Sequence, residues 1–166
     1  MDKVYTKKGD EGFTQDFGGN RIRKDDSLIR ISGKIDFLQS ALDRSILQSP
    51  ENSEILFWIQ KKLWQIAGEL FNCPGDCLID PIVEKDILQI ENFTDQFGEP
   101  PKKFVRFDNE KSICFNECRV RCRELESYLS TLLHEGKLRK EIYQFINRLS
   151  SLFFMLAYVS SEITNR

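Results

Sequence analysis

The sequence lacks several features that would assign it to a common functional class. No stretch approaches the roughly 18 uninterrupted apolar residues that a membrane-spanning helix requires. The formal net charge is only -2, so the basic bias typical of nucleic-acid-binding proteins is missing. We therefore expect a chain that contacts neither a membrane nor nucleic acid.

Cysteine is too sparse for a disulfide framework, with five residues, an odd number. The first residues, MDKVYTKKGDEG, are too polar for a signal peptide, so we expect a cytoplasmic protein with free thiols. Cys114, Cys118 and Cys122 recur at every fourth position and could bind Zn²⁺ or an iron–sulfur cluster. Short C-x-x-C turns are absent, however, and small buried cysteines in a helix seam are commoner. We predict no metal site.

What the sequence does contain is helical periodicity. The chain has 166 residues, of which 40% are hydrophobic and 30% charged, as in one soluble globular domain. Apolar residues recur at intervals of three and four, and strand-like alternation is almost absent. We predict a single all-α domain over 1–166, in which a glycine-rich arm (1–26) precedes a five-helix bundle (27–166). The helical stripes cover residues 28–46, 55–70, 83–97, 108–132 and 138–163.

The second predicted helix is apolar over much of its circumference. Besides its stripe it carries Phe57, Trp58, Trp64 and Phe71. This pattern predicts a well-buried helix. The same aromatics leave open a third kind of role, that of a structural bundle that binds a partner through them.

The glycine-rich arm has a composition that suits an anion. Its glycines let backbone N–H groups approach a phosphate closely, while hydroxyl and ammonium groups add donors. The spacing of a Walker A loop is missing. On composition alone, a flexible arm without a ligand is the better interpretation. The candidate phosphate contacts are Thr6, Lys7, Lys8, Gly9, Thr14 and Lys24.

Charged and polar residues also occur beside the helical stripes. Arg119, Arg123 and Glu126 share one helix face because they lie at i, i+4 and i+7. Asn147 lies beside the last stripe, and Asp36 lies beside the first. A charge near a core stripe is costly unless it is paired, so Asp36 needs a cation that Arg119 or Arg123 could supply. Ordinary bundle salt bridges are the competing interpretation.

Taken in order, these segments resemble the corrinoid adenosyltransferases of the PduO type. The arm contains Tyr-Thr-Lys-x-Gly-Asp-x-Gly-x-Thr, then Gly-Gly-x-Arg and Lys-Asp-Asp. The family's Y-G-x-V-D-E-L-N-S segment corresponds to SGKIDFLQS at 32–40, and its R-x-x-C-R-R-A-E-R motif to RVRCRELES at 119–127. Its Asn-Arg-Leu-Ser motif begins at Asn147. The resemblance covers nearly the whole chain.

The resemblance implies a cobalamin adenosyltransferase-like homotrimer with active sites between subunits. It implies that the arm orders over ATP, with Mg²⁺ bridging the phosphates. The six arm residues named above would contact ATP, and Arg123, Glu126 and Asn147 would complete the nucleotide site. Asp36 and Arg119 would form an ion pair between subunits.

The resemblance also implies how cobalamin is handled. Phe104 matches a phenylalanine that displaces the lower axial base of cobalamin, which makes Co(II) easier to reduce. The Co(I) formed would then attack the ribose C5′ of ATP. The family's L-P-G-G turn is replaced by RFDN at 106–109, and Glu124 replaces an arginine. The alternative is therefore a non-catalytic relative that binds ATP or a corrinoid as a carrier or regulator.

Overall fold

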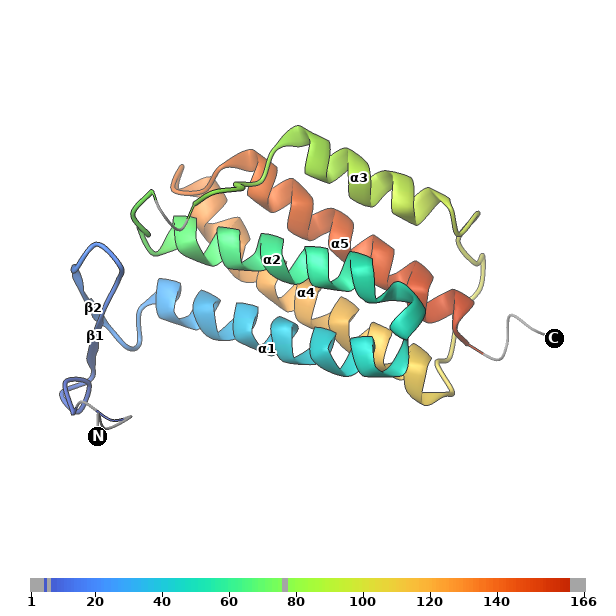
Figure 1. The fold of residues 1–166 in the computed structure, drawn as a ribbon, viewed down its shortest axis with the longest axis horizontal. Coiled ribbons are helices and arrows are strands. Elements are labelled where there is room, and N and C mark those ends of the chain that lie inside the picture. The colour runs from blue at the N-terminus through green and yellow to red at the C-terminus, as the bar shows by residue number, and fades with distance from the viewer. Residues whose placement is uncertain (1–4, 6, 76–77, 162–166) are drawn as a thin grey trace.

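Five α-helices, one 3-10 turn and one β-hairpin follow one another along the chain. The computed structural model describes residue 5, residues 7–75 and residues 78–161. The order is β1 (Phe13–Gln15), β2 (Arg21–Arg23), α1 (Ser27–Gln48), η1 (Pro50–Asn52), α2 (Ser53–Leu70), α3 (Glu84–Asp95), α4 (Glu110–His134) and α5 (Lys140–Val159). The predicted all-α bundle of five helices is confirmed (Figure 1). No helix among the described residues is long and apolar enough to span a membrane.

The helix starts follow from capping side chains. Asp26 accepts a hydrogen bond from the Leu28 backbone N–H at 2.9 Å, so α1 begins at Ser27. Asn109 accepts from the Ser112 N–H at 2.8 Å, while the Ser112 hydroxyl faces the Asn109 N–H. This reciprocal arrangement is a capping box, with Asn109 as the cap of α4.

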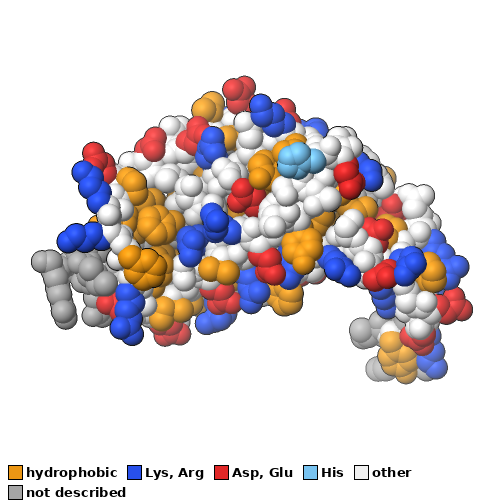
Figure 2. Space-filling model, turned by 180° about the vertical axis from the view of Figure 1, so that it is seen from behind, with side chains coloured by type: hydrophobic (Ala, Val, Ile, Leu, Met, Phe, Trp, Pro, Cys, Tyr) orange, Lys and Arg blue, Asp and Glu red, His pale blue; other side chains and the backbone are white. Residues whose placement is uncertain are grey.

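The core lies between α4 and its neighbours. α4 packs against α5 and α1, α3 packs on α5, and α2 packs on α1 (Figure 1). The apolar stripes meet in one continuous cluster, where Trp58 meets Phe145 edge-on with ring centroids 5.9 Å apart. The arm extends past one end of this bundle (Figure 2).

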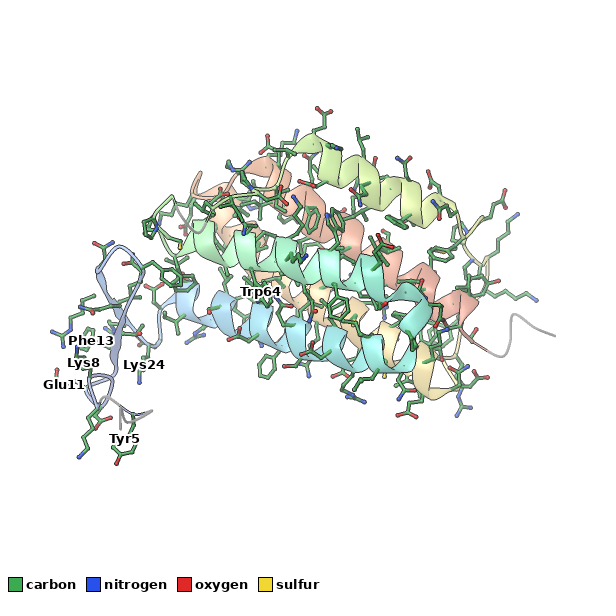
Figure 3. All side chains as sticks on the ribbon, in the orientation of Figure 1. Tyr5, Lys8, Glu11, Phe13, Lys24 and Trp64 are labelled. Atoms are coloured by element: carbon green, nitrogen blue, oxygen red, sulfur yellow. The ribbon has the colours of Figure 1, made fainter. Side chains whose placement is uncertain are left out.

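The prediction that α2 is well buried holds for its inner side and is wrong for two of its aromatic residues. Phe57 is 50% exposed. Trp64 is 62% exposed (Figure 3). The reason is that α2 is an outer helix that packs mainly on α1. Its far side has no neighbouring helix within the described chain to cover it.

A buried lysine on the inner side of α2 holds the connection to α3. The Lys62 side chain is 2% exposed, and its Nζ lies 2.8 Å from an Asp80 carboxylate oxygen and 3.0 Å from one of Asp86. Asp86 also accepts the Val83 N–H at 2.9 Å. One cation thus neutralises the acidic residues on either side of the turn into α3.

The cysteines of α4 are core residues. Cys114, Cys118 and Cys122 are free and buried, and burial raises the pKa of Cys118 to about 12. No cluster of three potential metal ligands occurs within residues 5, 7–75 and 78–161. Cys73, just after α2, is disulfide-bonded, so the expectation of free thiols is wrong there.

Candidate active site

The arm folds into a hairpin that surrounds a cavity. β1 and β2 pair antiparallel, with Phe13 opposite Arg23 and Thr14 opposite Ile22. The cavity has a volume of about 910 Å³. The structure therefore brings together every predicted arm contact that it describes, while Thr6 lies outside the described residues. The lining residues are Lys7, Lys8, Gly9, Asp10, Glu11, Phe13, Thr14, Gln15, Arg21 and Lys24.

Lys24 approaches the backbone of Gly9 closely. A Cβ placed on Gly9 would lie only 2.6 Å from Lys24 Nζ, so the ammonium group rests against the glycine backbone. Lys7 has a φ of 60°, a left-handed conformation that is uncommon for a residue with a side chain. Glu11 pairs with Arg21 at 2.9 Å, whereas no ion pair of Lys7, Lys8 or Lys24 occurs in the described chain. The cavity thus presents cations to an incoming anion (Figure 3).

Two arginines of α4 line a second cavity, of about 380 Å³, against α3 and α5. Burial, and then the charge of Arg123, lowers the pKa of Arg119. Ser150, Ser151 and Phe154 from α5 complete much of the wall. Two neighbouring guanidinium groups make this surface suitable for a phosphate chain.

Glu126 of α4 and Asn147 of α5, two of the expected nucleotide contacts, meet in the structure. Asn147 Nδ2 donates to Glu126 Oε1 at 2.6 Å, and the Tyr143 hydroxyl donates to the same oxygen at 3.2 Å. Arg148 donates to Asn147 Oδ1 at 2.9 Å and to Glu91 of α3 at 2.6 Å. Sequence reasoning missed Tyr143 and Glu91, which orient the pair.

Phe104 lies in the connector between α3 and α4, where it is 98% exposed. It lines a third cavity, of about 530 Å³, with the neighbouring residues 103–107 and with Arg119 and Phe154. The same Arg119 and Phe154 line the cavity that contains Arg123. The predicted corrin-side and nucleotide-side residues therefore lie on adjoining surfaces.

The expected contact of Asp36 with Arg119 or Arg123 is not formed within one chain. Asp36 is exposed on α1 and forms no ion pair in the described structure, and Arg119 Nε donates instead to Asn116 Oδ1 at 2.9 Å. The burial argument was wrong because Asp36 points away from the stripe it follows. Contact between subunits stays a prediction.

The charge reversal at Glu124 is compensated locally. Lys34 Nζ of α1 lies 2.6 Å from Glu124 Oε1. Arg121 lies over the Phe37 ring, with its Cζ atom 5.0 Å from the ring centroid. Two departures from the family pattern, Phe37 and Glu124, thus belong to one α1–α4 contact.

Solved structures of known function share this fold. An ATP complex of a variant PduO-type ATP:corrinoid adenosyltransferase from Lactobacillus reuteri matches 98% of this chain and 96% of its own, with a TM-score of 0.83 and 24% identity. A variant of the same enzyme complexed with cobalamin and ATP gives a TM-score of 0.84 at 24% identity, over 98% and 93% of the two chains. The fold is that of a PduO-type adenosyltransferase.

The sequence comparison identifies the family. The cobalamin adenosyltransferase profile matches residues 4–160. A corrinoid adenosyltransferase of Citrobacter freundii is 34% identical over 96% of this chain and 95% of its own. One from Bacillus subtilis is 30% identical over 95% and 86%, and the mouse protein is 30% identical over 93% and 71%. The chain belongs to the cobalamin adenosyltransferase family.

Proposed function

We propose that this protein transfers the 5′-deoxyadenosyl group of ATP to a reduced corrinoid, giving adenosylcobalamin and triphosphate from cob(I)alamin. The observation that carries the proposal is the pair of adjoining cavities that share Arg119 and Phe154. One contains Arg123 and suits phosphate groups, and the other contains Phe104 and several apolar side chains that suit a corrin ring. Family membership supports the same reaction.

The reaction needs no general base from the protein. The Co(I) of the substrate donates an electron pair to ribose C5′, a Co–C bond forms, and the C5′–O bond breaks. Triphosphate leaves with the bonding pair of the broken C5′–O bond, the Co(I) pair remains in the new Co–C bond, and no proton moves. The protein aligns the two substrates and stabilises the leaving charge, for which we assign Arg123 and the arm residues Lys7, Lys8 and Lys24. Glu126 and Asn147 are assigned to the nucleoside.

We further propose a homotrimer with shared sites. The arm lies beyond one end of the bundle (Figure 1). Arg123 instead lines a cavity with the end of α3 and with residues from the second half of α5. One chain does not bring the two sets of predicted nucleotide contacts together, so a site containing both requires a second copy. The exposed Asp36 is then available to pair with Arg119 of a neighbour.

In this proposal Mg²⁺ binds together with ATP and not at a separate site on the protein. Asp10 and Glu11 are the carboxylates of the arm cavity, and Arg21 already pairs with Glu11. The phosphates themselves would supply most of the oxygen ligands that Mg²⁺ prefers. The cytoplasmic location also stays a prediction.

Adenosylcobalamin formation tests the proposed function. Chemically reduced cob(I)alamin and ATP with Mg²⁺ are supplied, and product is followed by absorbance. We expect turnover by the natural chain and a loss of about 100-fold or more in Arg123→Ala, because a charge that stabilises the leaving group is removed. Arg44→Ala, which removes an exposed arginine paired with Glu117, is the matched control and should retain activity.

A non-catalytic relative is the second candidate. It is favoured by RFDN at 106–109, which replaces the family's L-P-G-G beside Phe104. ATP binding by calorimetry without any product from cob(I)alamin would establish this alternative and overturn the transferase.

A further inference from the structure

The arm is attached to the bundle through one buried carboxylate. Asp16 is 9% exposed and directly follows β1. Its carboxylate accepts hydrogen bonds from Asn20 N at 2.7 Å, Asn20 Nδ2 at 2.8 Å and Asn72 Nδ2 at 2.9 Å. We call Asp16, Asn20 and Asn72 the arm clasp.

The bundle half of the clasp has a fixed geometry. Asn72 follows α2 in the left-handed region, with a φ of 53°. The Cys73 N–H donates to Gly68 O at 2.8 Å and the Asn72 N–H to Glu69 O at 3.3 Å. These two bonds form a Schellman ending, in which asparagine is the usual substitute for glycine. They fix the backbone of Asn72 and so limit where its amide can lie.

A backbone contact beside the clasp completes the attachment. The Phe17 N–H donates to Phe71 O at 3.1 Å, joining the arm to the last residue before Asn72. The hydrogen bonds from Asn20, and then from Asn72, hold the pKa of Asp16 below its usual range. The carboxylate is therefore ionised at neutral pH and accepts all three bonds.

The clasp lies at the closed end of the hairpin whose other end bears the predicted nucleotide contacts. Asp16 is two residues beyond Thr14, and Asn20 is four residues before Lys24. The β1–β2 ladder connects the two ends. Lys8, Phe13 and Lys24 lie around the end of the hairpin opposite the clasp (Figure 3). The clasp and the Phe17–Phe71 bond therefore hold the turn end of the hairpin to the end of α2, while residues 24–26 join its other end to α1.

We propose that Asp16 and Asn72 are positioning residues, which touch no substrate but hold the arm where its cavity can receive the phosphates of ATP. This inference rests on the proposed function. Its physical basis is preorganisation, since an arm already held in place loses less conformational entropy when ATP binds. An arm released from the bundle would bind only in the fraction of molecules where it happens to be placed correctly.

Two variants break the contact between Asp16 and Asn72, one on the arm side and one on the bundle side. Asp16→Ala deletes the acceptor, and Asn72→Gly deletes the donor while keeping a residue that adopts a positive φ without strain. We expect each to weaken ATP binding measured by calorimetry about tenfold. We also expect faster hydrogen exchange at the Phe17 amide. Asp25→Asn, which changes an exposed arm carboxylate paired with Arg23, should leave that exchange unchanged.

Kinetics and rescue separate positioning from a general loss of structure. In both variants the KM for ATP should rise about tenfold while kcat at saturating ATP changes little, and the helical circular dichroism should be unchanged. Asp16→Asn combined with Asn72→Asp restores a donor and an acceptor across the contact. We expect this exchanged pair to recover most of the affinity that Asp16→Asn alone loses.

Each outcome decides the proposal. Unchanged exchange at Phe17 in both variants would show that the clasp does not anchor the arm. Faster exchange with unchanged ATP affinity would show that anchoring does not serve the nucleotide. A natural chain that binds no ATP would overturn the proposed function and this role together, and exchange would still show whether the clasp anchors the arm.

Discussion

Phe104→Ala is expected to make the protein about 10- to 100-fold slower when cobalamin is supplied as Co(II) with a mild reductant, and to change the rate little when Co(I) is supplied. Phe104 is almost fully exposed at a cavity wall, where its ring can cover the lower axial side of the cobalt. An apolar ring excludes a fifth ligand there, and loss of that ligand raises the Co(II) reduction potential. Alanine leaves room for the base or for water.

Electron paramagnetic resonance measures this coordination directly. With Co(II)-cobalamin and ATP, the natural chain should give a four-coordinate signal that Phe104→Ala abolishes. Phe57→Ala is the matched control, because it removes another half-exposed phenylalanine on the outer face of α2. The same spectrum from the natural chain and the Phe104 variant would count against the assignment.

Lys62→Ala should lower the free energy of unfolding by about 3–5 kcal/mol, the usual cost of breaking a buried ion pair from one side. The Asp86 side chain is 8% exposed and would lose its cationic partner, the ammonium group 3.0 Å away. The substitution also leaves a cavity, which adds to the loss.

Urea denaturation of the natural chain and the variants measures this change in the free energy of unfolding. Lys61→Ala, at the adjacent exposed position of the same helix, should change the free energy of unfolding by no more than about 0.5 kcal/mol. If the Lys62 variant lost less than about 1 kcal/mol, Asp86 would have found another partner or water, and the pair would not hold the α2–α3 connection.

The helices could be predicted because their signal is local. The stripe of α5 needs only the three-and-four spacing of its own apolar residues, and the cap at Asn109 needs only its neighbours. The exposure of Trp64 and the burial of Lys62 could not be predicted in this way. Both depend on which side of α2 meets another helix, and that is decided by the arrangement of the whole bundle.

The residues of the candidate site also differ in whether local sequence could identify them. The arm residues that line one cavity, and Glu126 and Asn147, which meet, could be named from the sequence because they belong to recognised motifs, and their role in binding stays a prediction. The arm clasp was missed because Asp16 and Asn72 are 56 positions apart and belong to no motif. The position of Asp36 was misjudged because neighbouring helical residues point in directions about 100° apart, so adjacency to a stripe does not imply burial.

The distance between the arm and Arg123 has a consequence for mixtures of defective chains. If each site combines the arm of one subunit with helix residues of another, a chain defective only in the arm and a chain defective only at Arg123 can repair one another. The two defective chains are mixed in equal amounts, unfolded and reassembled. The mixture should regain activity that neither chain has alone, because some sites then combine an intact arm with an intact Arg123. A site built within one chain would give no such complementation, and the mixture would stay inactive.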